Sequence, residues 1–439
     1  MMANLKQKTI PILVSLLILI TGVTVSFAED FDISAPIAIL VELETGQVLY
    51  EKNADQRWAP ASTTKIITAL TALENTPLDK EMKASRNAIN SIPSDYGIAG
   101  IRPGEILAFQ DLLNFVLIIS ANEASNVIAE NVVPSGNISD FIDLMNKKAE
   151  ELGLKNSHFT NTYGLDEDNH YTTARDLAIA SREAMKYPIF RQIVALTEVP
   201  LPDTNLRKSD GWDRWHIEST NRLLKSRSDY YDRVTGIKTG YTGKAGRCLV
   251  FSAVNNEGLE LIGVILGAET NDILFAEAKK LLEYGYMNYK VQTLASSGEF
   301  FGRYEVADAV DNISVELQTL GSVQHLLPVS PEKLQTEVTV KEVLNTPFTA
   351  PVEKGQVMGY KTWFYKGEEI GSVQLIAMND IEKSIHAQIR DKINELIEDK
   401  TIRNIAIIIG ILILLLIILR IILKGVSRRR NYYHKHYRF

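Results

Sequence analysis

Two residues near the N-terminus have the types and spacing needed for nucleophilic catalysis. Ser62 and Lys65 are three positions apart at the start of a helical pattern, so their side chains are expected to share one face. A serine hydroxyl is a weak nucleophile that needs a nearby base, and a lysine can be that base when its amine is neutral. Burial and a positive neighbour such as Lys238 would both lower the pKa of that lysine. The spacing therefore predicts a serine nucleophile activated by lysine.

Two further motifs belong with this pair. Ser120-Ala121-Asn122 follows a very apolar run, and Lys238-Thr239-Gly240 occurs once in the chain. Neither Ser-x-x-Lys nor Ser-x-Asn is specific alone, since Ser330 and Lys333 repeat the first spacing in a region with a β pattern. The order of the three motifs is what predicts one serine-lysine site.

Other chemistries find no support in the sequence. There is no Gly-x-Ser-x-Gly elbow and no His-Glu-x-x-His zinc motif. The residues His158, His170 and His216 are scattered and are expected to be local hydrogen-bonding residues. Cys248 is the only cysteine, so an intrachain disulfide and a multi-cysteine metal site are excluded, and its apolar context predicts a packed residue in a strand. We expect neither a metal nor a cofactor.

The N-terminal segment has the pattern of a secretory signal. Lys6 and Lys8 precede an apolar stretch over residues 10–25, and Ser26-Phe27-Ala28 supplies the small residues of a cleavage site. Residues 1–28 are therefore predicted to be a signal peptide. The alternative is an uncleaved membrane anchor, which the short apolar core disfavours.

The C-terminal end has the pattern of a membrane span. Residues 405–419 are uninterrupted apolar sequence, and Arg420 lies near one end, where it can reach the headgroups. We predict a transmembrane helix over residues 402–424 and a basic tail over 425–439. Because no acid offsets the basic residues that follow the span, the tail is expected in the cytoplasm. The rival interpretation, a nucleic-acid-binding arm, is disfavoured because the basic residues adjoin the span.

The net charge of the remainder argues against a nucleic-acid partner. The 439 residues carry a formal charge of −7, and leaving out the two lysines of the signal and the seven basic residues of 420–439 gives −16 for residues 29–419. An acidic region of this kind is a poor nucleic-acid binder. We therefore expect a single-pass protein of the cell membrane, with its catalytic domain on the extracytoplasmic side and no nucleic-acid partner.

The rest of the chain is predicted to form two domains and a connecting helix. A hairpin pattern over 36–51 and strand patterns over 247–253 and 259–266 enclose a mostly helical region, which indicates an α/β domain with a helical insertion at 31–290. Short apolar runs separated by Gly, Pro and Asn indicate a small β-domain at 291–379. Residues 380–401 place isoleucines on one face of an amphipathic helix, which could lie on the membrane or form a stalk.

Three stretches resemble the D-alanyl-D-alanine carboxypeptidases, the low-molecular-mass penicillin-binding proteins. They are Ala61-Ser62-Thr63-Thr64-Lys65, His158-Phe159-Thr160-Asn161 with Gly164-Leu165, and Gly236 to Thr242 continuing through Ala245-Gly246. The resemblance covers residues 33–290 closely and 291–378 more weakly. It implies a β-lactamase/transpeptidase-like α/β fold, an antiparallel sheet flanked by helices, followed by a small β-sandwich.

The resemblance also implies a role for each site residue. It makes Ser62 the acylated nucleophile and Lys65 its base, with Ser120 and Lys238 relaying protons to the leaving D-alanine. The substrate-binding residues implied are Asn122 for the substrate backbone, Thr239 for the terminal carboxylate, and the edge from Lys238 through Gly240 to Tyr241. The backbone N–H groups of Ser62 and Tyr241 would form the oxyanion hole.

Two departures from the family pattern are mild. Ala121 and Glu123 stand where many members have Gly and Asp, and neither change removes Ser120 or Asn122. The C-terminal end is a full span, whereas many relatives have only an amphipathic helix, which affects anchoring and not chemistry.

The function expected is removal of the terminal D-alanine from peptidoglycan pentapeptide through a Ser62 acyl-enzyme, with β-lactam antibiotics as covalent inhibitors. The first alternative is a β-lactamase, which is disfavoured because no convincing Glu-x-x-x-Asn pattern lies between Asn122 and Lys238 to hold a deacylating water. The second is a non-hydrolytic penicillin-binding sensor, which is disfavoured because the cytoplasmic tail contains no signalling domain. Product release from a defined pentapeptide distinguishes the three.

Overall fold

A computed structural model describes residues 31–93, 99–208, 216–226 and 228–436. The predicted signal peptide, residues 1–28, and the end of the basic tail lie outside the described residues. The chain divides after Asn288 into two compact units.

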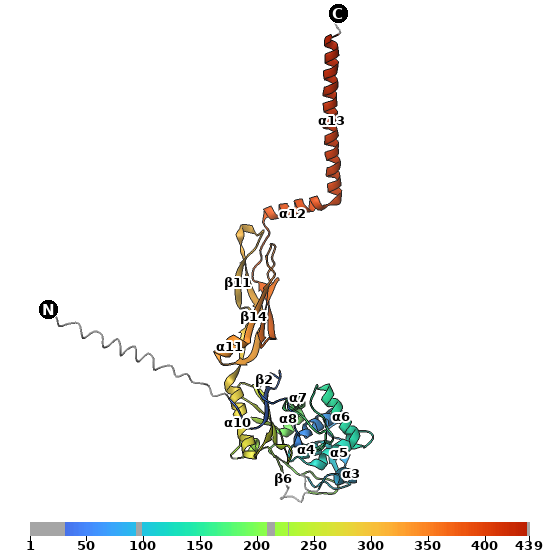
Figure 1. Cartoon of the computed structure of the whole chain (residues 1–439), viewed down its shortest axis with the longest axis vertical. Coiled ribbons are helices and arrows are strands. Elements are labelled where there is room, and N and C mark those ends of the chain that lie inside the picture. Colours follow the sequence, from blue (N-terminus) through green and yellow to red (C-terminus); the bar gives the residue numbers. More distant parts are fainter. Residues whose placement is uncertain (1–30, 94–98, 209–215, 227, 437–439) are drawn as a thin grey trace, which may run out of the picture. The chain divides into compact units, whose positions relative to one another are not determined.

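The first unit is built on a five-stranded antiparallel sheet with the strand order β2-β1-β9-β8-β7 (Figure 1). Strands β8 and β9 are almost continuously buried and apolar, because helices such as α7 and α10 pack against the sheet. The strands are β1 (Ile37–Glu42), β2 (Val48–Lys52), β7 (Val234–Thr242), β8 (Gly246–Val254) and β9 (Glu260–Ala268). This arrangement confirms the predicted α/β domain with an antiparallel sheet.

The chain between β2 and β7 forms the helical insertion expected from the sequence. The helices that follow β2 are α2 (Lys65–Asn75), α3 (Arg86–Asn90), α4 (Phe109–Leu117), α5 (Asn122–Val132), α6 (Ile138–Glu151), α7 (Ala174–Ala184), α8 (Pro188–Val194) and α9 (Arg222–Lys225), and α10 (Asn271–Asn288) follows β9. Two short antiparallel ribbons accompany them: β3 (Glu81–Lys83) with β4 (Ile106–Ala108), and β5 (Glu198–Pro200) with β6 (His216–Glu218).

Helix α2 lies in the core of this unit, and its position decides the character of the site. Every residue from Lys65 to Ala72 is buried, so the first two turns have no solvent-facing side. A helix buried on all sides is surrounded by other elements, here α4, α5, α6 and α7. Lys65, at its first position, is consequently placed inside the protein.

The second unit contains a small β-domain, as predicted. Its strands are β10 (Tyr289–Ala295), β11 (Phe300–Glu305), β12 (Ser314–Leu320), β13 (Val323–Pro328), β14 (Val338–Leu344), β15 (Val357–Tyr365) and β16 (Glu368–Ala377). They form a two-stranded sheet, β10-β13, and a five-stranded sheet, β11-β12-β16-β15-β14. The core of this domain extends to Ile381, which is buried and pairs with Val352, so a domain end at 379 leaves out one core residue.

One short helix, α11 (Pro331–Glu337), interrupts the β-domain and explains the second Ser-x-x-Lys. Ser330 is the N-cap of this helix, and its hydroxyl accepts the backbone N–H of Lys333. Serine at the N-cap with proline at the next position is a common helix start. Ser330 is therefore a capping residue of α11.

Two helices end the chain (Figure 1). Helix α12 (Ile385–Glu398) exposes Ile385, Ile389 and Ile393 on one face, as the amphipathic pattern predicts. Helix α13 (Lys400–His436) includes a 26-residue stretch, Lys400–Gly425, that is long and apolar enough to cross a membrane. The predicted apolar C-terminal helix is confirmed.

Candidate active site

Ser62 lies in a tight turn that precedes α2 and does not belong to the helix itself. Ala61–Thr64 form a 3-10 turn, and α2 begins at Lys65. The sequence predicted that Ser62 opens an α-helix, and the difference favours the pair, because residues three apart eclipse one another in a 3-10 turn. Ala61 has a φ of 49°, a left-handed conformation that is uncommon for alanine and is a typical form of strain at functional sites.

The amine of Lys65 is fully buried and has three oxygen neighbours. Its Nζ lies 3.0 Å from Ser62 Oγ, 2.7 Å from Asn122 Oδ1 and 2.7 Å from the carbonyl oxygen of Tyr163. Two of these oxygens belong to carbonyl groups and can only accept hydrogen bonds. A neutral amine has two N–H groups and one lone pair, so with both N–H groups donated to the carbonyls its lone pair faces the Ser62 hydroxyl.

Burial and charge both favour the neutral form of Lys65. Burial holds the pKa of the Lys65 amine well below its usual value, and the nearby positive charge of Lys238 lowers this pKa further. Glu123 opposes the shift, since its negative charge raises the Lys65 pKa. The two lowering effects are those that the sequence analysis required of a lysine base.

Lys238 is the second buried lysine of the site. It lies on β7 and is 1% exposed, and burial lowers its pKa to about 7. Its Nζ donates to the carbonyl oxygen of Thr239 at 2.9 Å. An amine with a pKa near neutrality can both give and take a proton at physiological pH.

Ser120 and Asn122 lie at the junction of α4 and α5. Ser120 has a φ of 66°, and its Oγ is buried without a hydrogen-bond partner among the described residues. Asn122 is the first residue of α5 and is held through its contact with Lys65. A buried hydroxyl without a hydrogen-bond partner is unusual, and Ser120 is therefore a candidate for contact with a ligand.

These residues meet at one cavity of about 280 Å³. Its wall includes the predicted residues Ser62, Ser120, Asn122, Thr239, Gly240 and Tyr241, together with Thr220, Arg222, Arg247 and Cys248. Lys65 and Lys238 are buried close by and contact residues of this wall through Ser62 Oγ and the Thr239 carbonyl. The structure thus brings all eight predicted site residues together.

Two glycines allow the close approach of backbones around Ser62. A Cβ on Gly240 would lie 3.1 Å from the backbone nitrogen of Ser62, so the Lys238-Thr239-Gly240 strand packs directly against the nucleophile turn. A Cβ on Gly164, which has a φ of 96°, would lie 1.7 Å from the carbonyl oxygen of Ala61. Position 164 therefore requires glycine, and at position 240 a side chain would be in tighter than ordinary contact with the Ser62 turn.

Three contributing residues were not predicted from the sequence. The Thr220 hydroxyl lies 2.6 Å from the Thr239 hydroxyl, and the Tyr163 carbonyl accepts from Lys65. The guanidinium of Arg247 lies over the Tyr241 ring at 3.6 Å. Thr220 and Arg247 belong to no motif, and a backbone carbonyl such as that of Tyr163 leaves no sequence signal.

Cys248 is fully buried in β8, and burial raises the pKa of its thiol to about 12, as expected for a packed residue.

Two protein-family models match the chain. The peptidase S11 family, D-alanyl-D-alanine carboxypeptidase, matches residues 23–270, and the C-terminal domain of penicillin-binding protein 5 matches residues 289–383. The chain belongs to the D-alanyl-D-alanine carboxypeptidase family. It is 32% identical over 354 residues to the D-alanyl-D-alanine carboxypeptidase DacF of Bacillus subtilis, an alignment that covers 80% of this chain and 86% of that protein.

Solved structures of related proteins share this fold. Penicillin-binding protein 5 of Haemophilus influenzae matches with a TM-score of 0.59 and 29% identity, covering 80% of this chain and 99% of that one. The Streptomyces K15 DD-transpeptidase matches with a TM-score of 0.54 and 29% identity, covering 58% of this chain and 98% of that one. The predictions of a serine D-Ala-D-Ala carboxypeptidase and of its two-domain penicillin-binding fold are confirmed.

In this carboxypeptidase, His170 supports the nucleophile turn and takes no direct part at the cavity. The Thr160 N–H donates to Nδ1 at 2.9 Å, so the other nitrogen, Nε2, carries the proton and donates to Thr64 Oγ at 3.0 Å. The Thr64 hydroxyl in turn donates to the carbonyl of Ala61. The imidazole is thus neutral, and burial lowers its pKa to about 4. This confirms the expectation of a local hydrogen-bonding histidine.

His170 is expected to make the stability of the protein depend on pH. Because its pKa falls from 6.5 to about 4 on folding, its contribution is complete above pH 6.5 and is lost as the pH falls through 4. The loss should be about 3 kcal/mol in the free energy of unfolding. Denaturant unfolding between pH 7 and pH 4 should show a smaller pH dependence for His170→Gln than for the wild type. Identical slopes would contradict the assignment.

Proposed function

We propose that this protein removes the terminal D-alanine from peptidoglycan stem pentapeptides through an acyl-enzyme on Ser62, and that β-lactam antibiotics inhibit it by acylating the same serine. Its family acts on peptidoglycan D-Ala-D-Ala substrates and binds β-lactams. The observation that supports the residue roles most strongly is the set of contacts of Lys65 Nζ, whose lone pair is left facing the Ser62 hydroxyl.

Acylation begins when the Ser62 hydroxyl passes its proton to the neutral amine of Lys65. The freed Oγ attacks the carbonyl carbon of the penultimate D-alanine, and the carbonyl oxygen becomes an oxyanion. The backbone N–H groups of Ser62 and Tyr241 donate to this oxyanion. The close packing of Gly240 against Ser62 supports this role, because it brings the strand that carries Tyr241 to the nucleophile turn.

The leaving D-alanine needs a proton on its amine before the C–N bond can break. Lys238 supplies it through the hydroxyl of Ser120, which gives its own proton and takes one from the lysine. The pKa of Lys238 near 7 supports its role as the proton source. The buried Oγ of Ser120 has no hydrogen-bond partner among the described residues, so it can accept from Lys238 when the substrate is bound. Water then attacks the Ser62 ester and gives a proton to Lys238, while Ser62 Oγ takes its proton back from Lys65 as the shortened peptide leaves. Both lysines thereby return to their starting protonation states.

Substrate binding uses the free edge of the sheet. Strand β7 is the last strand in the order β2-β1-β9-β8-β7, so its outer edge can pair with an extended peptide over residues 238–241. Asn122 holds the substrate backbone through its side-chain amide. The Thr239 hydroxyl donates to the terminal carboxylate, which gives the enzyme its preference for a free C-terminus.

Ser62 is predicted to be the residue that is acylated. Penicillin should add its mass to the peptide that contains Ser62, and Ser62→Ala should abolish both this label and the release of D-alanine, because no other hydroxyl contacts Lys65 Nζ among the described residues. Mass spectrometry of the digested protein makes the measurement. The matched control is Ser330→Ala, which removes only a helix cap; a label on Ser330 would refute the assignment.

If the neutral amine of Lys65 is the base, replacing Lys65 by arginine should slow acylation. Lys65→Arg keeps the positive charge but holds its proton, so acylation by penicillin should fall at least about a hundredfold. Stopped-flow or quenched acylation kinetics give the rate. Acylation within twofold of wild type would mean that Lys65 is not the base.

We further propose that the protein is anchored by α13 in the cell membrane, with its catalytic unit on the extracytoplasmic side. The apolar stretch Lys400–Gly425 and the basic residues beyond it support this orientation. The signal-like N-terminus, residues 1–28, supports export of the catalytic unit.

This topology predicts that the anchor is dispensable for chemistry. A chain ending at Ser384 keeps Ile381 in the β-domain core and should be secreted, soluble and active on a soluble pentapeptide, because the residues that line the cavity, from Ser62 to Phe275, all belong to the first unit. In spheroplasts of cells with the full chain, added protease should remove the catalytic unit and spare a tag at Phe439. Loss of the tag, or a folded but inactive shortened chain, would each contradict this proposal.

A further inference from the structure

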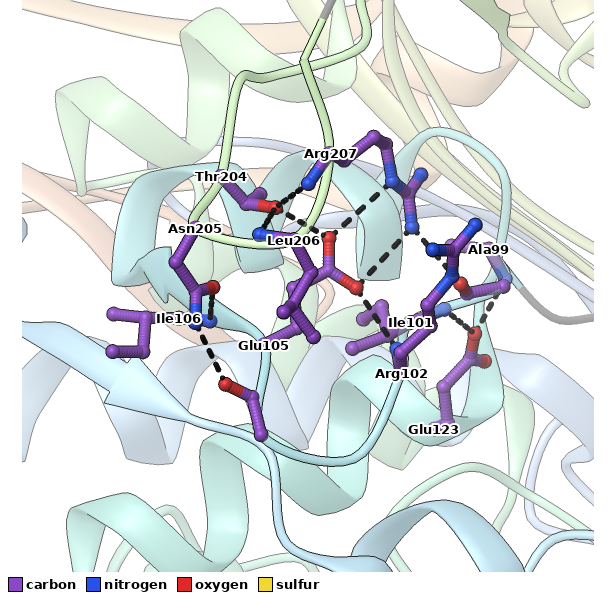
Figure 2. A network of polar contacts seen from close by, with 12 residues as sticks. Ala99, Ile101, Arg102, Glu105, Ile106, Glu123, Thr204, Asn205, Leu206 and Arg207 are labelled. Atoms are coloured by element: carbon purple, nitrogen blue, oxygen red, sulfur yellow. Dashed lines mark hydrogen bonds and ion pairs between the residues drawn. The ribbon is translucent and has the colours of Figure 1, made fainter.

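A buried carboxylate outside the proposed machinery joins two segments of the first unit (Figure 2). Glu105 has no exposed surface, and its Oε1 accepts the Thr204 hydroxyl while its Oε2 accepts the Arg102 N–H, both at 2.8 Å. The Arg207 guanidinium pairs with both oxygens at 3.3 Å. Burial of a carboxylate is costly unless it is paired and hydrogen-bonded. These contacts therefore offset the cost of burying Glu105, and Glu105 in turn links the residues that make them.

Further contacts fasten the same two segments, 99–106 and 202–207. The Asn205 side chain accepts the Ile106 N–H at 2.8 Å and donates to the Gly104 carbonyl at 3.0 Å. Arg207 also donates to the Gly100 carbonyl at 2.9 Å. Side-chain contacts to backbone groups on both sides of Glu105 fix the register of one segment against the other.

Segment 99–106 also contacts the start of α5, where Asn122 is the first residue. Glu123, the next residue, is buried, and its Oε1 accepts the Ala99 N–H at 2.6 Å and the Ile101 N–H at 3.4 Å (Figure 2). The segment that Glu105 and Arg207 hold is therefore bound directly to the start of α5. Asn122, the residue before Glu123, in turn accepts a hydrogen bond from Lys65 Nζ.

The other segment leads to Thr239. Segment 202–207 follows β5, which pairs with β6 to form a two-stranded ribbon. Beyond the last pair of this ribbon, the Ser219 N–H donates to the Thr197 carbonyl at 2.7 Å. The next residue, Thr220, donates its N–H to the Ile118 carbonyl at 3.1 Å and places its hydroxyl 2.6 Å from that of Thr239. Segment 202–207 lies beyond the Pro200–His216 end of this ribbon, and Thr220 lies beyond its Glu198–Glu218 end. The ribbon therefore connects the segment held by Glu105 to the residue that contacts Thr239.

We propose that Glu105 and Arg207 are positioning residues for recognition of the substrate carboxylate, acting through Thr220. The proposal rests on the function proposed above. Only one proton can lie between the two threonine oxygens, so Thr239 can donate to a carboxylate when Thr220 is the donor to Thr239 Oγ. Glu105 and Arg207 anchor the ribbon from which Thr220 makes this contact.

The first test compares two matched carboxylates in the full-length protein in detergent. Glu105→Gln keeps the shape and removes the charge that pairs with Arg207, and it should raise KM for a D-Ala-D-Ala peptide about tenfold while kcat stays within about twofold. The control is Glu130→Gln, whose carboxylate likewise accepts one N–H and one hydroxyl, both of Ser85, and it should leave KM unchanged. Equal KM values for the two variants would overturn the proposal.

A second variant covers the case in which Glu105→Gln does not fold, which a thermal melt reveals. Arg207→Lys keeps the charge at a partly exposed position but cannot contact both carboxylate oxygens in a fork, so KM should rise by a smaller factor. An unchanged KM for a folded Arg207→Lys would overturn the proposal.

The decisive measurement is a double-mutant cycle with Thr220→Val, which removes the hydroxyl and keeps the volume. If Glu105 acts through Thr220, the double variant should have the same KM as the more impaired single variant. Effects that multiply would show an independent, merely structural role and would overturn the proposal. A wild-type protein that releases no D-alanine would refute the proposed function, whereas an active wild type with multiplying effects refutes this inference alone.

Discussion

Two buried lysines set the chemistry of this protein. Lys65 and Lys238 are each almost fully buried, and the positive charge of Lys238 lowers the pKa of Lys65. Two buried ammonium groups repel one another and lack the solvation that water would give them. The folded state therefore favours loss of a proton, and this makes a lysine able to serve as the base for a serine.

The surrounding fold maintains that burial. Helix α2 is enclosed on all sides over its first two turns, which carries Lys65 into the core. Gly164 lets its backbone approach the turn of Ser62 to a distance that a side chain would forbid, and Gly240 gives a second close approach from β7. The neutral ring of His170 supports the same turn from behind through Thr64. Each feature limits the access of water to the amine or fixes the geometry of its partners.

Part of the fold and part of the site could be predicted from local signals in the sequence. The three-residue spacing of Ser62 and Lys65 predicts that their side chains lie on one face. The order of strand and helix patterns predicts the α/β fold and the β-domain. Helix α11 was not predicted, although serine before Pro331 is a helix-start signal, because it interrupts a run of strand-like segments. Sequence alone did not show that Ser62 lies in a 3-10 turn, since one residue decides where the helix begins.

Contacts between distant segments were not predictable in this way. Thr220 approaches Thr239 because the β5–β6 ribbon leads there, and Glu105 meets Arg207 across about a hundred residues of chain. Neither pair belongs to a motif, and hydrogen-bonding partners of this kind are selected by the tertiary structure. The recognised motifs therefore supply the reacting groups, while residues without a motif supply their orientation.

The most direct test of the central claim is the titration of Lys65 itself. Nitrogen NMR of the free protein labelled with 15N-lysine, with Lys65→Arg used to assign the signal, reports the protonation of each amine. A neutral base requires Lys65 to lose its proton far below the ordinary lysine value of about 10.4. Titration of Lys65 at that ordinary value would contradict the account.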